Sequence, residues 1–553
     1  MRGAAWRCPA QVWSRARASA QVSATRPAVP VAVLRAIGAR RPADSHRILE
    51  IGPVLHAYGG VRGAASVRFR SSAALEGSDP EALQYQKKTQ VEHVLHRPDV
   101  YVGSMEPTER QLLVFDIKTR EVQFRTVNYV PGLLKLFDEI LVNAADNKIR
   151  DPSMNRIEVT IDAKSGTVSV WNNGKGIPVV KHSQYDDIFV PELVMGNLLA
   201  GSNFDDSKKR LGGGRHGYGA KLTNIFSTAF TIETADTARQ LVYKQTWRDN
   251  MSVCEPAVIT PLPQGDKGDK SSKDKSADFT RISFSVDLSR FTKKAKRLDK
   301  DIVALWARRV LDVAGCHPGV KVFLNGKLLR VKGIGDLAKQ YLVAIDAARG
   351  VDGDGEAGGD SKGGVVELSD ATGRWRVALA AGKGSASSNS VSYVNGIWTP
   401  RGGTHLKHVT DQLVDVLHNH IRKNFKDIDV SAPQIRAHLW VCVSALIENP
   451  SFDSQSKEAL TTHPDKFGSA FALKAASVRK VVSSADLVAR IVRTAQGKMG
   501  RDLDKSTAAA AKRGGGGRRL LIPKLEDANW AGTSKSDDCT LILTEVPTLS
   551  PKP

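Results

Sequence analysis

An α+β fold with two globular blocks is predicted for this chain of 553 residues, and three observations predict it. Residues 131–148 carry apolar side chains at helical spacing after a proline, which is tolerated at the start of a helix. Residues 156–162 and 167–174 alternate like two paired strands joined by a short Lys-Ser-Gly turn. A second run of strand and helix patterns extends from about 366 to 480.

The composition is that of a globular protein with an excess of basic residues. Its 41% hydrophobic and 25% charged content are ordinary for such proteins. The formal net charge of +22 favours an anionic partner, nucleic acid before a membrane surface. No stretch approaches the roughly 18 apolar residues of a membrane span, so we expect a soluble protein without a membrane partner.

The cysteines indicate a reducing compartment. There are five, an odd number, and they are scattered without a C-x-x-C pair, which argues against a disulfide framework and a zinc site.

The N-terminal segment 1–80 differs from the rest of the chain. Residues 1–75 are rich in arginine and serine and contain only two acidic residues, Asp44 and Glu50. This composition is typical of an organellar transit peptide, which predicts a mitochondrial or other organellar location. A disordered basic arm, or a nuclear signal on a nuclear protein, is the alternative.

The stretch "GGGRHGYGAKLTNIF" (212–226) is the first candidate for a phosphate site. It does not match a Walker P-loop, because Ala220 and Lys221 follow Gly219 where that motif requires lysine and a hydroxyl residue. The order of its glycines is also the reverse of a dinucleotide-binding fingerprint. A glycine-rich turn before a helix is the alternative.

The predicted helix 131–148 carries a polar stripe. Glu139, Asn143, Asp146 and Asn147 recur at one face of the helix, two carboxylates with two amides. A solvated helix face is the alternative interpretation. The next strand ends in "WNNGKGIP", where glycines permit close approach of a flat ligand and the amide of Asn172 can pair with a base edge.

In this order, these three segments resemble the nucleotide-binding fold of the superfamily of gyrase, Hsp90, histidine kinases and MutL (GHKL). Seven longer segments are similar to the ATPase half of eukaryotic-type DNA topoisomerase II, over roughly 84–480 and 520–545. These segments are "YQKKTQVEHVLHRPDVYVGSMEP", "FDEILVNAADNKIRDPSM", "VWNNGKGIPV", "RHGYGAKLTNIFS", "SYVNGIWTPRGGTH", "SALIENPSFDSQSKEALTT" and "KLEDANWAGTSKSDDCTLILTE".

The resemblance implies a domain order. It implies a GHKL-type α/β sandwich over 84–333 and a transducer domain like domain 2 of ribosomal protein S5 over 334–480. A helical, basic linker would follow over 481–524. Residues 525–545 would begin a metal-binding Toprim region with Glu545 as its first acid, and 546–553 do not match the family. We therefore expect the chain as given to lack the DNA-cleavage core.

The resemblance also implies roles for residues of the first block. Glu139 would be the general base for the attacking water, Asn143 a ligand of Mg²⁺, and Asn172 the contact to adenine. Further ATP contacts would come from a loop and from the glycine-rich lid: Gly201, Ser202, Asn203, Gly214, Arg215, His216, Gly217, Tyr218, Gly219, Ala220 and Lys221.

Three residues of the second block, Gln455, Ser456 and Lys457, resemble the family's loop that reaches the γ-phosphate. Lys457 would neutralise charge in the transition state, together with Gln455. Without the resemblance, Lys457 is predicted to be an exposed lysine. Tyr85 resembles the strap tyrosine that meets the nucleotide of the partner subunit. Two departures from the family are His216, where asparagine is usual, and Ser456, where threonine is usual.

The function implied by the resemblance is that of an ATP-operated gate that controls DNA topology by duplex passage. Its cofactor would be Mg²⁺ with ATP as substrate, and its partners would be double-stranded DNA and a second copy of the chain. Two alternatives are another ATP-operated clamp of the superfamily, of the chaperone or mismatch-repair type, and a DNA clamp that binds nucleotide without turnover.

Overall fold

The computed structural model describes most of the chain between residues 84 and 512. The described residues are 84–185, 187–201, 209–214, 217–263, 277–292, 297–349, 364–382, 390–512, 528, 530 and 534–540. From Tyr85 onward they belong to one compact unit. No helix among them is long and apolar enough to cross a membrane.

Several sequence-based expectations lie outside the described residues. They concern segment 1–80, most of 525–545 and the tail 546–553, and at the nucleotide site the residues Ser202, Asn203, Arg215 and His216, together with Glu545.

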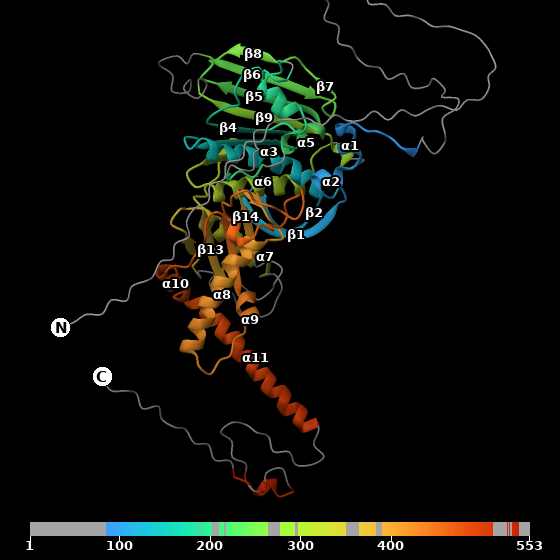
Figure 1. The fold of residues 1–553 in the computed structure, drawn as a ribbon. Coiled ribbons are helices and arrows are strands. Elements are labelled where there is room, and N and C mark those ends of the chain that lie inside the picture. Colours follow the sequence, from blue (N-terminus) through green and yellow to red (C-terminus); the bar gives the residue numbers. More distant parts are fainter. Residues whose placement is uncertain are drawn as a thin grey trace, which may run out of the picture. The chain divides into compact units, whose positions relative to one another are not determined.

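A nine-stranded sheet forms one layer of the first block (Figure 1). Its order is β11-β10-β3-β4-β9-β5-β6-β7, with β8 paired to β6. All these pairings are antiparallel except that of β3 with β10. The strands are β3 (Arg156–Asp162), β4 (Thr167–Asn173), β5 (Ser227–Asp236), β6 (Leu241–Arg248), β7 (Val253–Cys254), β8 (Val258–Pro261), β9 (Phe279–Val286), β10 (Lys321–Leu324) and β11 (Lys327–Leu328). The two strands expected at 156–162 and 167–174 are β3 and β4.

Helices cover one face of this sheet, as Figure 1 shows for α3, α5 and α6. They are α3 (Pro131–Arg150), α4 (Val190–Gly196), α5 (Gly219–Ile225) and α6 (Lys300–Cys316). The helix α3 begins at a proline, as expected, and it is buried along almost its whole length. Phe137 of α3 stacks on Trp306 of α6 with ring centroids 5.0 Å apart, in the core between the two helices.

The first described residues pack onto the helices α3, α5, α6 and α7 (Ile334–Arg349). Two short helices, α1 (Gln90–His96) and α2 (Pro98–Val102), precede a hairpin of β1 (Thr108–Asp116) and β2 (Glu121–Tyr129). The helix α1 starts with a capping box, in which Thr89 and Glu92 satisfy each other's backbone N–H groups.

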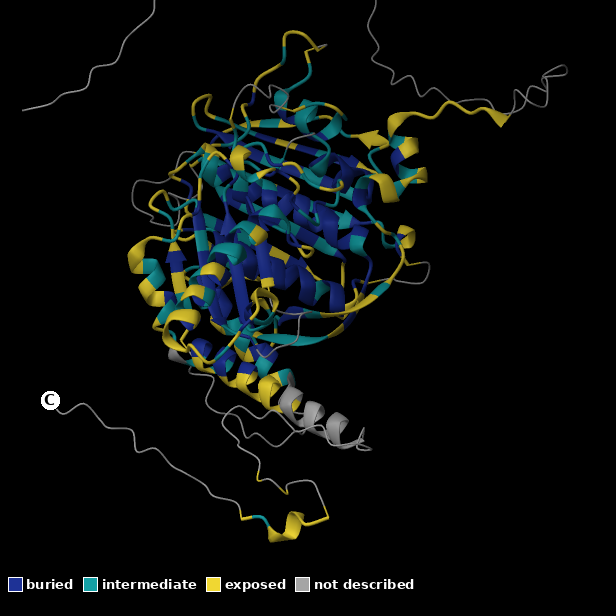
Figure 2. Cartoon of the chain, turned by 60° about the horizontal axis from the view of Figure 1, so that its bottom comes forward, coloured by how far each residue is buried: buried dark blue, intermediate teal, exposed yellow. Residues whose placement is uncertain are grey.

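The second block has a five-stranded sheet of order β12-β13-β16-β14-β15, in which β14 and β16 run parallel. Its strands are β12 (Val366–Ser369), β13 (Trp375–Ala381), β14 (Ser390–Val394), β15 (Ile397–Trp398) and β16 (Leu439–Ala445). Its helices are α7 (Ile334–Arg349), α8 (Thr404–Asn424), α9 (Ala432–Ala437), α10 (Ala475–Val482) and α11 (Ala485–Lys512). Figure 2 shows buried residues running through the sheets of both blocks. The mixed architecture confirms the predicted α+β class.

A buried charge network joins the two blocks at α6. The guanidinium of Arg309 donates to Asp138 of α3 at 2.8 Å, to Asp312 at 2.6 Å and to the carbonyl of Gly396, between β14 and β15, at 2.9 Å. Arg308 lies 3.1 Å from Asp312. Two arginines thus balance two aspartates, and the network connects the residue before Glu139 with the second sheet.

Replacing Arg309 with methionine is expected to lower the free energy of unfolding by about 3–5 kcal/mol, because it removes the ion pair of the buried Asp138 and one of the two arginines beside the buried Asp312. Urea unfolding followed by circular dichroism measures the change. The matched control is Arg436→Met at an exposed ion pair with Asp411, which we expect to cost less than about 1 kcal/mol. Equal losses in both variants would contradict a structural role for the network.

Candidate nucleotide site

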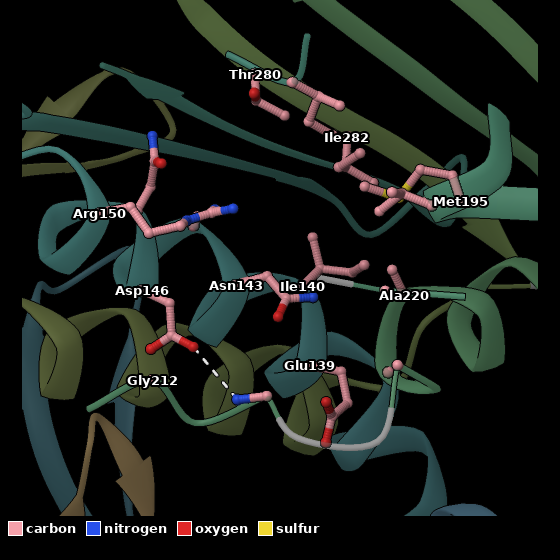
Figure 3. A pocket seen from close by; sticks show the side chains of 18 of the residues that line it. Glu139, Ile140, Asn143, Asp146, Arg150, Met195, Gly212, Ala220, Thr280 and Ile282 are labelled. Carbon is pink, nitrogen blue, oxygen red and sulfur yellow. Dashed lines mark hydrogen bonds between the residues drawn. The ribbon is translucent and has the colours of Figure 1, made fainter. Parts of the chain in front are cut away.

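A cavity of about 570 Å³ opens between α3, the end of β4, the glycine-rich segment and a loop of the second block. This volume is in the range of ligand pockets. Figure 3 shows Glu139, Asn143 and Asp146 projecting from one face of α3, with Met195, Thr280 and Ile282 on the opposite wall. The polar stripe of α3 therefore lines a cavity, and its interpretation as a solvated helix face is wrong.

Glu139 is held between two lysines at one end of the cavity. Its Oε1 lies 2.7 Å from Nζ of Lys135, one turn earlier in α3, and 3.1 Å from Nζ of Lys457. All three side chains are buried. Burial alone would raise the pKa of Glu139, but the charges and hydrogen bonds of the two lysines outweigh it and lower the pKa to about 2. The carboxylate is therefore ionised at neutral pH.

Lys457 comes from the segment that follows β16, and it reaches α3 across the junction of the two blocks. Its backbone has a φ of 62°, and its N–H donates to the carbonyl of Ser454. Only 6% of Lys457 is exposed, so its interpretation as an exposed lysine is wrong. Gln455 also lines the cavity, whereas Ser456 does not and instead faces Gly103.

Asn143 and Asp146 follow Glu139 on the same face of α3. A side chain added at Gly214 would lie 3.6 Å from Oδ1 of Asn143, so the amide oxygen faces the glycine-rich segment. Oδ2 of Asp146 accepts N–H groups of Gly213 at 2.8 Å and Gly214 at 3.4 Å. Its Oδ1 is buried and has no hydrogen-bond partner among the described residues. Burial raises the pKa of Asp146 to about 7, against the lowering effect of the two glycine N–H groups.

This raised pKa predicts a pH dependence of stability that Asp146→Asn removes. The folded state binds the proton of Asp146 more tightly than the unfolded state, in which the pKa is 3.8. Between about pH 4 and about pH 7, Asp146 is ionised in the unfolded state but largely protonated in the folded state. The stability of the parent therefore falls as the pH rises through this window. We expect the free energy of unfolding of Asp146→Asn, relative to the parent, to increase across this window and to level off above it. A difference that is flat with pH in chemical unfolding would contradict the assignment.

The other end of the cavity suits a flat, partly apolar ligand. Asn172 is 4% exposed at the end of β4, opposite Thr280 of β9, and its Nδ2 donates to the Asn173 carbonyl. The wall beside it is apolar and is made by Val170, Ile177, Val190, Val194, Met195 and Ile282. Gly174 has a φ of 93°, and a side chain there would collide with Met154, so only glycine fits after this strand.

Glycines of the glycine-rich segment line the cavity beside Glu139. A side chain at Gly219 would collide with the carboxylate of Glu139, so glycine is required for this close approach. Lys221 is buried and donates to the carbonyls of Ala200 and of Gly217, the latter at 2.6 Å. Burial lowers the pKa of Lys221 to about 8.

Most of the predicted site residues that the structure describes line this one cavity. They are Glu139, Asn143, Asn172, Gly201, Gly214, Gly217, Tyr218, Gly219, Ala220, Lys221, Gln455 and Lys457. Tyr85 does not line it and is 85% exposed. Its predicted contact is with the nucleotide of a partner subunit, and this stays a prediction.

The sequence-based reasoning missed Lys135 as a site residue and gave no role to Asp146. The spacing of Lys135, four residues before Glu139 on a helix, is the signal that could have found it. No cluster of three or more His, Cys, Asp or Glu that could hold a metal occurs in the part of the chain that the structure describes. An ion that keeps its waters, such as Mg²⁺, needs only one or two protein oxygens.

Comparisons with known protein families agree with this geometry. Residues 132–245 match the family of histidine kinase-, DNA gyrase B- and HSP90-like ATPases. Residues 345–511 match the DNA gyrase B family.

Individual relatives were also found. DNA topoisomerase 2-alpha of Homo sapiens is 44% identical over 463 residues, which are 83% of this chain and 28% of the relative. DNA topoisomerase 2 top-2 of Caenorhabditis elegans is 43% identical over 85% of this chain and 29% of the relative. The chain therefore spans less than a third of the length of these relatives.

Two solved structures are similar over their full length. The ATPase region of topoisomerase II from Saccharomyces cerevisiae has a TM-score of 0.65 at 39% identity and covers 75% of this chain. The ATPase and transducer domains of DNA topoisomerase II from Balamuthia mandrillaris have a TM-score of 0.66 at 42% identity and cover 76% of this chain. Together with the two sheets, the polar stripe of α3 and the buried Lys457, these similarities show that the chain belongs to the type II DNA topoisomerase family, in the part represented by these ATPase and transducer domains.

Proposed function

We propose that this chain binds Mg²⁺–ATP in the cavity beside α3 and hydrolyses it. The observation that carries the proposal is the meeting of Glu139 and Lys457 in one buried cavity, although they come from different blocks. A carboxylate next to a cation suits phosphoryl transfer to water, since the carboxylate can orient the nucleophile and the cation can neutralise the phosphate.

The polar and apolar ends of the cavity orient the nucleotide. The adenine would lie on the apolar wall with Asn172 at its edge, and the phosphates would face the N–H groups of Gly214, Gly217 and Gly219. Backbone N–H groups in a glycine-rich turn form a favourable surface for an anion. The triphosphate then ends at Glu139, where hydrolysis would take place.

Lys457 would change partners when the nucleotide binds. In the structure it neutralises Glu139 together with Lys135. A γ-phosphate placed beside Glu139 carries more negative charge than one carboxylate and would attract Lys457. Lys135 would stay with Glu139 and hold the carboxylate in place, so that Glu139 accepts the proton of the attacking water.

Asn143 fits a magnesium site. Its amide oxygen faces the phosphate side of the cavity, one turn from Glu139. The ion would supply charge neutralisation on the phosphate oxygens, and Asn143 would hold its position relative to α3.

This assignment predicts that Asn143→Ala weakens binding of Mg²⁺–ATP by about 10-fold, one lost polar contact of about 1.4 kcal/mol. Binding of ATP in the presence of a chelator should be alike in variant and parent. Titration calorimetry with and without Mg²⁺ measures both quantities. Unchanged affinity for Mg²⁺–ATP together with slower hydrolysis would show that Asn143 acts in another way.

ATP binding and turnover would serve the DNA-topology function that the names of the relatives indicate. We infer that ATP closes two copies of the chain into a gate and that hydrolysis reopens it, with double-stranded DNA as the partner. The net charge of +22 supports an anionic partner.

Sedimentation velocity tests the gate. Addition of a non-hydrolysable ATP analogue should convert monomer to dimer, and a monomer at saturating analogue would count against the gate.

The alternatives differ from this proposal in measurable ways. A clamp of the chaperone or mismatch-repair type would also dimerise and hydrolyse ATP, but the relatives at 43–44% identity are topoisomerases. A clamp without turnover would bind ATP and release no phosphate.

The organellar location expected from residues 1–75 remains a proposal, which import of a reporter fused to these residues would test.

A further inference from the structure

The second block holds the segment that leads into the glycine-rich stretch. Residues 209–214 lie at the cavity, and their backbone forms hydrogen bonds with α3 on one side and with the second block on the other. Asp146 of α3 accepts the N–H of Gly213. On the other side, the backbone N–H of Asn449 donates to the carbonyl of Arg210 at 2.9 Å, and Oδ1 of Asn449 accepts the N–H of Arg210 at 3.2 Å.

The turn between β14 and β15 makes a second contact to the same segment. Asn395 and Gly396 both have positive φ, 51° and 76°, which is the conformation of a tight Asn-Gly hairpin turn. The turn projects Ile397, which is 1% exposed, onto Gly213. A side chain added at Gly213 would lie 2.8 Å from Cδ1 of Ile397 and 3.0 Å from Cγ1 of Val142 in α3.

The same turn is tied to the helix that carries Glu139. The carbonyl of Gly396 accepts a hydrogen bond from Arg309, whose guanidinium also binds Asp138. Side-chain bonds between Asn395 and the backbone of Ile447, at 2.8 and 2.9 Å, fix the turn to the strand that continues toward Asn449. The turn and Asn449 therefore form one rigid support.

We propose that Ile397 and Asn449 are positioning residues of the nucleotide site, which press residues 210–213 against α3 and so fix where the glycine N–H groups meet the phosphates. The proposal rests on the proposed ATP function and extends it, because it makes the second block part of the binding site before any nucleotide arrives. Neither Ile397 nor Asn449 lines the cavity, so we expect Glu139 and Lys457 to keep their positions when these two residues are changed. The expected effect is therefore on the affinity for nucleotide more than on the rate of hydrolysis.

The test uses the full chain and four variants. Ile397→Val and Ile397→Ala remove the packing against Gly213 in two steps. Asn449→Ala removes the acceptor for the Arg210 N–H, and Asn449→Asp keeps that acceptor in a backbone conformation that aspartate also tolerates. A fifth variant, Ile435→Ala, is the control for core packing, because Ile435 is fully buried in the second block on α9.

We expect Ile397→Ala and Asn449→Ala to raise KM for ATP about 10- to 100-fold, the scale of effects from a misplaced binding group, with kcat within about threefold of the parent. Ile397→Val should be intermediate, and Asn449→Asp should restore KM. Amide hydrogen exchange at residues 209–214 should be faster in the two alanine variants and unchanged in Ile435→Ala.

Parental KM and parental exchange in Ile397→Ala and Asn449→Ala would overturn the inference, and so would an equal rise of KM in Ile435→Ala. These results leave the proposed function intact if the parent hydrolyses ATP. A parent that binds no ATP would overturn the proposed function, and the exchange measurement, which needs no nucleotide, would still decide whether the second block holds residues 209–214.

Discussion

Glu139→Gln is expected to bind ATP nearly as well as the parent and to hydrolyse it about 10²–10⁴-fold more slowly, which is the usual contribution of a general base. Glutamine keeps the size and the hydrogen-bonding oxygen of the side chain but cannot accept the proton of the attacking water. The bonds from Lys135 and Lys457 to that position can persist in the variant, so the shape of the cavity should be kept. Phosphate release under saturating ATP, with analogue binding measured in parallel, gives the two quantities separately.

The control for this prediction is Glu255→Gln. Glu255 forms an ion pair with Arg248 at the edge of the first sheet, away from the cavity, and its loss should leave turnover unchanged. Turnover of Glu139→Gln within a few-fold of the parent would remove Glu139 from the role of base.

Lys457→Ala is expected to lower hydrolysis by about 10²–10³-fold, the scale seen when one group that stabilises transition-state charge is removed. The variant also deprives Glu139 of one of the two cations that lower its pKa. The pKa of Glu139 in the nucleotide-free enzyme should therefore rise, and the acid limb of the pH profile of kcat/KM, which reports that state, should move to higher pH. This second effect separates a loss of charge at the site from a general loss of structure.

Lys466→Ala is the matched control, because Lys466 is exposed on the same stretch of the second block. It should show parental rates and a parental pH profile. If Lys457→Ala slowed hydrolysis without moving the acid limb, the pairing of Lys457 with Glu139 would be irrelevant to catalysis, and Lys457 would act on the phosphate alone.

The local elements could be predicted from the sequence because each has a short-range signal. The proline at the start of α3 and the periodicity behind it define that helix, and alternation defines β3 and β4. The stripe of Glu139, Asn143 and Asp146 could be placed on one face for the same reason. Two of the alternatives, a solvated face for this helix and an exposed Lys457, concerned burial, which periodicity alone does not determine.

The contacts between the blocks could not be predicted in this way. The burial of Lys457 depends on its contact with Glu139, which lies 318 residues earlier in the chain. The parallel pairing of β14 with β16 brings Asn395 beside Ile447, and no local pattern sets that register. The site therefore combines one helix that the sequence describes well with a support that only the tertiary structure reveals.

The central claim is that Lys457 and Glu139 act on one ATP molecule held between the two blocks. A crystal structure of the chain with Mg²⁺ and a non-hydrolysable ATP analogue tests this claim most directly. We expect adenine beside Asn172, phosphates against the N–H groups of Gly214, Gly217 and Gly219, and Nζ of Lys457 on the γ-phosphate, while Lys135 remains on Glu139. A nucleotide bound elsewhere, or one bound in this cavity with Lys457 still paired to Glu139 and away from the γ-phosphate, would contradict it.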